Sequence, residues 1–165
     1  GTLRYKKLHY NMVRVGLSLY GYSPIEELSS EIELEPALKV KARVTLIRKV
    51  PAGTGIGYGH TYKTKKDSIL AVIGIGYADG VSRALSGKIS VLFKGERLQQ
   101  VGSITMDQLV IDVSDQPQIK IGDIVTLLGK DGLTSITPKQ WGDLSGSIPW
   151  EVLCGFKNRL PRVVI

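Results

Sequence analysis

Apolar and polar side chains alternate between residues 38 and 50. One face of this stretch carries Val40, Ala42, Val44 and Leu46, and the other carries mainly lysine and arginine. A period of two with one wet face is typical of an antiparallel strand. The pattern therefore predicts a strand here with these four apolar side chains turned inward.

Other apolar runs are short and separated by turn-forming residues. Residues 69–76 are apolar on both faces, which predicts a fully buried strand. Further short strands are expected at 88–94, 96–104, 108–113 and 123–128. Strands of this length and spacing are typical of a barrel or a sandwich.

Two short helices are expected near the C-terminus. Thr137, with a proline after it and Gln140 three positions on, matches a capping box. Ser147 is expected to cap a second helix over 149–155. The segment from Asn158 to Ile165 is expected to be extended, and residues 12–20 are expected to be a buried segment that leads into a loop.

Composition fits one soluble domain that needs no disulfide. The chain has 165 residues, 42% of them hydrophobic, a net charge of +7 and a single cysteine. The basic residues are spread out and form no basic tail, so charge alone gives little support for nucleic-acid binding. No apolar run is long enough for a membrane helix, and the first residues do not resemble a signal peptide.

Most familiar catalytic patterns are missing from the chain. The two histidines lie far apart in sequence, so no metal site is expected, and there is neither a nucleophile elbow nor a phosphate-binding loop. Several polar residues nevertheless stand in unusual places. Arg14 interrupts an apolar run, and Tyr58 lies among glycines at every second position from 53 to 59. Each has a simple alternative explanation as a turn or surface residue.

Together these segments resemble the C-terminal part of alanine racemases. Five blocks match in order: Arg14 to Gly21, Gly57 to Tyr62, Gly74 to Gly80, Gly102 to Gln108 and Arg159 to Arg162. The resemblance covers residues 12 to 162. It implies a mainly β, barrel-like domain over 25–165 with short helices near its end. Residues 1–24 would then be the end of a cofactor barrel and a linker, with the rest of that N-terminal (β/α)8 barrel outside the chain.

The resemblance implies a cofactor, pyridoxal 5'-phosphate, and a homodimer. The lysine that forms the Schiff base lies outside this chain, so the isolated domain is expected to be inactive. Tyr58 takes the place of the catalytic tyrosine, which removes or returns a proton on one face of a small amino-acid substrate and is supplied to the partner subunit's site. Neighbouring cationic groups would have to lower the pKa of a phenol for it to act as a base near neutral pH.

The resemblance also assigns roles to other residues. Arg14 takes the place of the arginine that faces the pyridine nitrogen, and Gly16 and Leu17 correspond to backbone amides at the cofactor phosphate. Tyr77 and Asp79 correspond to the substrate entrance, and Met106 lies near the substrate carboxylate. His60 matches no required residue.

One position departs from the family pattern. Asn158 stands where the family usually has a tyrosine that reaches the cofactor phosphate and crowds the substrate side chain. A shorter side chain with donors and an acceptor suggests a pocket that admits serine as well as alanine. This resembles the serine/alanine racemases of vancomycin-resistance systems, the VanT type. Their membrane region would anchor a parent protein whose racemase part is cytoplasmic.

Two alternatives remain at this point. A small basic β-barrel could bind single-stranded nucleic acid, although the aromatic content is only 7% and the tyrosines do not line up on one strand. The chain could also be a purely structural domain of a larger enzyme. Oligonucleotide binding and a change of Tyr58 to phenylalanine would separate these from the racemase interpretation.

Overall fold

The computed structural model describes residues 5–25 and 33–164. The chain divides into two compact units, Gly1–Leu38 and Lys39–Ile165. The boundary predicted between residues 24 and 25 adjoins a segment, 26–32, that lies outside the described residues, so it stays a prediction. Among its described residues, 5–25 and 33–38, the first unit contains the 3-10 helices η1 (Lys6–Leu8) and η2 (Gly16–Tyr20).

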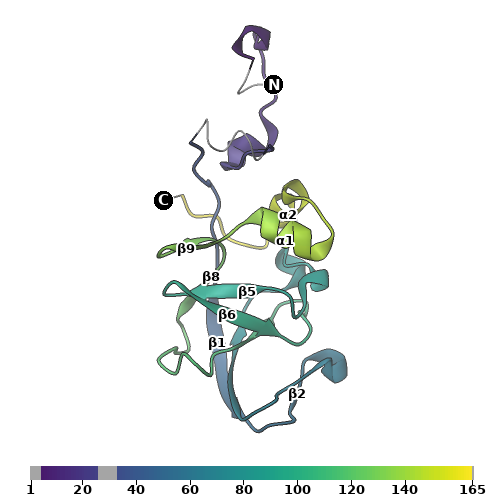
Figure 1. The fold of residues 1–165 in the computed structure, drawn as a ribbon, viewed down its shortest axis with the longest axis vertical. Coiled ribbons are helices and arrows are strands. Elements are labelled where there is room, and N and C mark those ends of the chain that lie inside the picture. The colour runs from purple at the N-terminus through teal and green to yellow at the C-terminus, as the bar shows by residue number, and fades with distance from the viewer. Residues whose placement is uncertain (1–4, 26–32, 165) are drawn as a thin grey trace. The chain divides into compact units, whose positions relative to one another are not determined.

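The second unit is mainly β, as predicted (Figure 1). Its strands are β1 (Val40–Val50), β2 (Gly55–Ile56), β3 (Tyr62–Lys63), β4 (Ser68–Ile73), β5 (Ser90–Phe93), β6 (Glu96–Val101), β7 (Leu109–Asp112), β8 (Ile124–Asp131) and β9 (Thr134–Ile136). Its helices are the 3-10 helices η4 (Tyr58–His60), η5 (Tyr77–Asp79) and η6 (Arg83–Leu85) and the α-helices α1 (Pro138–Ser145) and α2 (Pro149–Gly155).

Six of the strands close into a barrel because β1 serves two neighbours. The hydrogen-bonded order runs β1-β4-β7-β6-β5-β8, and β8 pairs back onto β1. The first part of β1, Val40 to Arg43, pairs with β8, whereas Val44 to Val50 pairs with β4. Closure leaves these strands without a free edge. Strand β9 continues the sheet beyond β8, and β2 and β3 form a separate hairpin.

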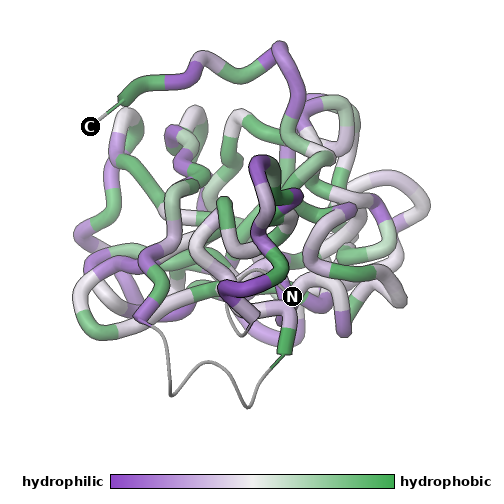
Figure 2. Tube along the Cα trace, turned by 90° about the horizontal axis from the view of Figure 1, so that it is seen from above, coloured by the Kyte–Doolittle hydropathy of each residue, from purple (hydrophilic) through white to green (hydrophobic). Residues whose placement is uncertain are grey.

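The barrel interior is filled by the apolar faces of its strands. Val40, Ala42 and Val44 are buried, as the alternation predicts, with charged residues between them. The prediction for Leu46 is wrong: its side chain is exposed, because the register of β1 against β4 shifts between Val44 and Leu46. A bulge of this kind turns the following side chains to the other face. Along the whole chain, short apolar segments alternate with short polar ones (Figure 2).

Most of the other strand predictions hold, with changed bounds. The strand expected over 69–76 ends at Ile73, because the amide of Gly74 already bonds to the carbonyl of Arg43 and the chain turns. Leu70, Ala71 and Ile73 are buried, in agreement with a strand apolar on both faces. The four shorter strands are present as β5 to β8.

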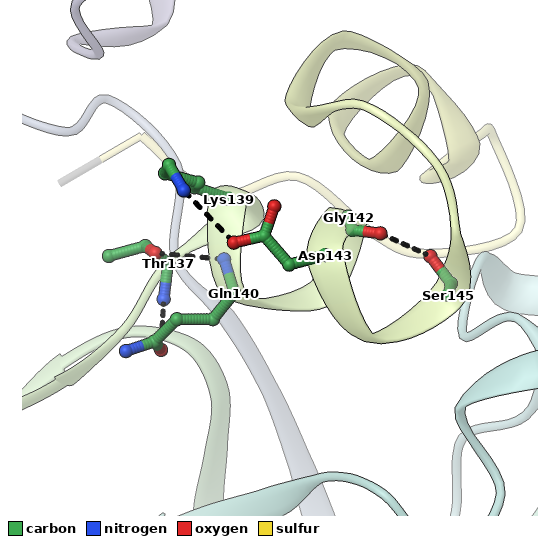
Figure 3. Close-up of polar contacts among 6 residues, drawn as sticks. All are labelled: Thr137, Lys139, Gln140, Gly142, Asp143 and Ser145. Atoms are coloured by element: carbon green, nitrogen blue, oxygen red, sulfur yellow. Dashed lines mark hydrogen bonds and ion pairs between the residues drawn. The ribbon is translucent and has the colours of Figure 1, made fainter. Parts of the chain in front are cut away.

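Helix α1 begins at the predicted capping box (Figure 3). The hydroxyl of Thr137 accepts from the amide of Gln140 at 3.3 Å, and the side-chain oxygen of Gln140 accepts from the amide of Thr137 at 3.1 Å. These two bonds satisfy amides that the first turn of a helix leaves without partners. On the exposed side, Lys139 pairs with Asp143 one turn later, at 3.0 Å. Helices α1 and α2 lie side by side at one end of the barrel (Figure 1).

Three local predictions are wrong. Helix α2 is capped by Ile148 with no side-chain bond, and the hydroxyl of Ser147 binds the carboxylate of Glu151 instead. The chain after Phe156 turns at Asn158 and Arg159 before it runs on, so it is not extended throughout. Residues 12–20 are mostly exposed rather than buried. A 3-10 helix with three residues per turn distributes its apolar side chains around the axis, and only Leu17 is covered.

Across residues 5–25 and 33–164, no helix combines the length and the apolar character needed to span a membrane.

Candidate functional site

The turn that carries Tyr58 is held by the loop after β6. The hydroxyl of Ser103 donates to the carbonyl oxygen of Tyr58 at 3.3 Å and lies 3.3 Å from the hydroxyl of Thr61. Gly57 has a φ of +70°, and a Cβ there would lie 3.1 Å from the amide nitrogen of Ser103. A residue with a side chain would be strained at this φ and would press on the loop. The glycines around Tyr58 therefore permit a tight turn against the Ser103 loop.

The side chain of Tyr58 itself is free to meet another molecule. It is 76% exposed, whereas its backbone is fixed by the contacts described above. Tyr58 and His60 lie in η4, which is a tight turn and not an extended segment. The ring of His60 instead lies over Gly55, where a Cβ would approach its Cγ to 2.5 Å. Both residues are exposed, but the imidazole ring of His60 rests against the backbone at Gly55.

The same loop also holds the turn with Tyr77. The amide of Tyr77 donates to the carbonyl of Thr105 at 2.9 Å, and the amide of Ala78 donates to that of Met106 at 3.0 Å. The contact is so close that a Cβ on Gly76 would lie 2.2 Å from the Thr105 oxygen. The side chains of Tyr77 and Met106 are both exposed. Loop 102–108 thus brings the predicted residues Tyr58, Tyr77 and Met106 to one rim of the barrel.

Asp79 is buried in this rim, and both oxygens of its carboxylate have partners. Its side chain is one of the few buried polar groups, 7% exposed. One carboxylate oxygen accepts from the amide of Gly76 at 3.0 Å, and the other lies 3.1 Å from Nε of Arg159. The same guanidinium bonds to Asp107, the residue after Met106. Asp79 therefore holds η5 and Arg159 in place.

The hydrogen bond to Asp107, followed by the charge of Asp79, raises the pKa of Arg159 above its ordinary value. Both interactions favour the cationic form, so the guanidinium stays charged between the two acids.

Asn158 lies in the turn just before Arg159, with its side chain exposed. The position that departs from the family pattern is thus adjacent in sequence to the residue that binds Asp79 and Asp107. Through Arg159, the C-terminal segment joins the rim formed by the Tyr77 turn and the Met106 loop.

Arg14, Gly16 and Leu17 belong to the other compact unit. Arg14 is exposed, Leu17 is buried and Gly16 begins η2 with a φ of +66°. Space is open where a Cβ on Gly16 would lie. Their predicted part in the site stays a prediction.

Three rim residues were not among the sequence-based candidates. Ser103, Asp107 and Arg159 lie in the matched blocks, but only their contacts show what they do. Asp107 and Arg159 are 52 positions apart. Asp79, Asp107 and Arg159 are charged residues in three different matched blocks. That pattern is the signal in the sequence that could have suggested the ion pairs of Arg159 with the two acids.

A cavity of about 340 Å³ lies elsewhere, between η6 and the two α-helices, beside Trp141. None of the predicted site residues lines it. The rim, which carries Tyr58, Tyr77 and Met106, is therefore the candidate site, and this cavity is not.

Residues 37–164 match the family model "Alanine racemase, C-terminal domain". An alanine racemase of Prochlorococcus marinus is 66% identical over 165 residues, which is 100% of this chain and 43% of that protein.

Solved structures agree with the sequence matches. Alanine racemase from Bacillus anthracis, crystallised with bound L-Ala-P, superposes with a TM-score of 0.87 at 38% identity, over 95% of this chain and 40% of that one. Alanine racemase from Bartonella henselae, with covalently bound pyridoxal phosphate, has a TM-score of 0.82 at 35% identity, over 90% and 40%.

The chain spans less than half the length of these relatives. The expected barrel-like β domain with two short C-terminal helices is confirmed, and the nucleic-acid alternative finds no support in these matches. The chain therefore belongs to the alanine racemase family, as its C-terminal domain.

Proposed function

We propose that the complete protein that contains this chain is a pyridoxal-phosphate-dependent racemase that interconverts L- and D-alanine, with Tyr58 as one of its two bases. The observation that carries the proposal is the exposed phenol of Tyr58 on a backbone held by Ser103. The matches to alanine racemases over nearly the whole chain support it.

The residues of the first unit fit the cofactor chemically. When bound, pyridoxal phosphate makes the hydrogen on Cα of the attached amino acid more acidic. The first amides of η2, at Gly16 and Leu17, have no acceptor within their own helix, and open space beside Gly16 would let a phosphate approach them. Arg14 would place a permanent positive charge at the pyridine nitrogen. Asn158, which belongs to the second unit, carries an amide whose donors and acceptor also suit a phosphate.

Tyr58 would move one proton. Its hydroxyl, brought against Cα of the substrate, would remove the hydrogen on one face and return one to the same face in the reverse direction. The lysine outside this chain would serve the opposite face. Because the phenol points away from its own domain, we propose that it completes the site of the partner subunit in a homodimer.

The rim would shape the way in for the substrate. The side chains of Tyr77 and Met106 are exposed, and backbone hydrogen bonds join the two segments that carry them. These side chains would border the amino acid on its carboxylate side. Asp79 would stand at the entrance as the residue that holds the Tyr77 turn, since both its oxygens already have partners.

We propose further that this racemase accepts L- and D-serine as a second substrate pair. Asn158 is smaller than the tyrosine usual in the family, and its exposed amide could bond to a serine hydroxyl. One added hydroxyl gains little without a matched partner, so we expect a shift in preference and not exclusion of alanine.

Replacement of Tyr58 by phenylalanine in the complete protein tests the proposal. We expect alanine racemisation to fall about 100-fold or more, because general-base catalysis contributes about that much. Exchange of the α-hydrogen with deuterated solvent should fall for one enantiomer and persist for the other, since the lysine side remains intact. Proton NMR measures both enantiomers.

The matched control is Tyr62→Phe, which removes the same hydroxyl four residues away, where the ring packs on the cluster of Ile56, Leu70 and Val101. It should leave both exchange rates near those of the wild type. Equal losses for both enantiomers in Tyr58→Phe would mean that Tyr58 is not a face-specific base. Full activity in Tyr58→Phe would indicate a structural domain without its own catalytic group.

A further inference from the structure

We propose that the hairpin that carries Tyr58 docks on an acidic surface of the partner subunit through a cluster of cations. The inference rests on the proposed function and deepens it, because it names the chemistry that brings Tyr58 to the partner's site. The cluster, called here the basic hairpin surface, consists of five exposed residues: Arg48, Lys49, Lys63, Lys65 and Lys66.

More than half of the chain's net charge is concentrated in this segment. Residues 48–67 contain these five cations and one acid, Asp67, so they carry +4 of the +7 of the whole chain. The carboxylate of Asp67 accepts from the amide of Ala52 at 3.0 Å. Among residues 5–25 and 33–164, no acid forms an ion pair with any of the five cations. Like charges gathered in one place repel each other, so the cluster fits an anionic partner outside this domain.

Strand pairing brings the two parts of the basic hairpin surface together, although the sequence separates them. Arg48 and Lys49 lie near the end of the pairing between β1 and β4, which finishes with Val50 opposite Ser68. Lys66 comes two residues before Ser68, so it lies just beyond the same end. The cations of β1 and those that follow the hairpin therefore lie at one end of the sheet.

The direction of Lys63 and Lys65 follows from the residue between them. Thr64 is buried, and its hydroxyl donates to the carbonyl oxygen of Pro51 at 2.8 Å. Side chains of successive residues in an extended segment point to opposite sides. Lys63 and Lys65 consequently point away from the domain together, where another molecule can meet both.

The hairpin would carry this charge to the partner together with Tyr58. Strands β2 and β3 pair only with each other, outside the barrel sheet (Figure 1). Lys63 follows Tyr58 by five positions, and five residues of chain span at most about 17 Å. A surface that receives the exposed phenol must therefore lie near Lys63 as well. Like charges across an interface oppose association, whereas opposite charges favour it, so the receiving surface should be acidic.

The test measures the dissociation constant of the dimer of the complete protein. Subunits labelled with a donor or an acceptor fluorophore are mixed and diluted, and the loss of energy transfer reports dissociation. The test variant combines Lys63→Gln, Lys65→Gln and Lys66→Gln. A second variant combines Lys63→Arg, Lys65→Arg and Lys66→Arg, which keeps the charge at each position.

The matched control removes the same charge from the same domain with Lys41→Gln, Lys120→Gln and Lys130→Gln. All three lysines are exposed. Lys41 lies opposite Thr126 of β8, Lys120 precedes β8 and Lys130 lies in it, so none belongs to the hairpin. Circular dichroism of each variant checks that the fold is intact.

For the wild type we expect the dissociation constant to rise about tenfold between about 50 and 500 mM KCl, because salt screens exposed charges. At low salt, the glutamine variant of the hairpin should dissociate about 10- to 100-fold more readily, with little further effect of salt. One exposed ion pair changes an equilibrium constant by up to about fivefold, and a two-fold symmetric dimer loses each pair twice. The arginine variant and the control should behave like the wild type. At protein concentrations above the dissociation constant, kcat of the glutamine variant should return to the wild-type value.

A glutamine variant that dissociates no more readily than the control would overturn the inference. So would equal weakening in both, since net charge and not the hairpin would then be responsible. Loss of binding to a single-stranded oligonucleotide with an unchanged dimer would assign the surface to another partner. An active wild type with an unaffected hairpin variant removes the docking surface alone, whereas a wild type inactive on alanine removes the proposed function whatever the dimer shows.

Discussion

Single residues on the rim divide into those that face outward and those that hold them. Tyr58, Tyr77 and Met106 are exposed, while Ser103 and Asp79 are buried and bonded to the backbone beside them. The sequence motifs marked both kinds without distinguishing them. Asp79 was expected at the entrance from its motif alone, and its contacts show a carboxylate whose two oxygens are already bound.

Asn158 carries the most specific prediction at this scale. In the complete protein, Asn158→Tyr should lower serine turnover relative to alanine about tenfold, because a phenol fills space that serine needs and removes a partner for its hydroxyl. The ratio of kcat/KM values for L-serine and L-alanine measures the effect.

A tyrosine at the neighbouring exposed position, Lys157→Tyr, is the control and should leave that ratio unchanged. If both variants gave the wild-type ratio, Asn158 would have no part in substrate choice.

Individual elements follow local sequence where their stabilising contacts are local. The capping box of α1 spans four residues, so it could be found without knowledge of the fold. The cap of α2 could not, because the Ser147 hydroxyl has more than one possible partner: it donates to the carboxylate of Glu151 instead of accepting from a backbone amide. Strand β1 shows the same limit: its alternation holds up to Val44 and fails at the bulge, which depends on the partner strand β4.

The capping box gives a stability prediction. Thr137→Ala should lower the free energy of unfolding of this chain by about 1 kcal/mol, because the amide of Gln140 loses its acceptor at the start of the helix. Urea unfolding followed by circular dichroism measures it.

Ser135→Ala is the matched control, since that residue binds Arg97 through its carbonyl and not through its hydroxyl. A Thr137→Ala variant as stable as Ser135→Ala would show that the cap adds nothing measurable to this domain.

At the scale of the whole molecule, the outward direction of Tyr58 predicts a shared active site. Two inactive variants of the complete protein would be mixed after unfolding together: Tyr58→Phe, and one that lacks the Schiff-base lysine outside this chain. If the phenol serves the partner's site, half of the dimers regain one intact site, and the mixture should reach about a quarter of wild-type activity.

Refolding each variant alone provides the background. If the mixture is no more active than the two separately refolded variants added together, Tyr58 and the lysine act within the same subunit. That result would contradict the shared site.

The sequence by itself determined the positions of most strands, the α1 cap and the five ordered blocks of the family, because these depend on side-chain alternation and on contacts between near neighbours. Tertiary structure alone decided the bulge after Val44, the closure of the barrel through two partners of β1, and the bonds of Arg159 to Asp79 and Asp107. These features join residues dozens of positions apart. Such residues meet only after the strands between them have paired, so no local pattern specifies the contact.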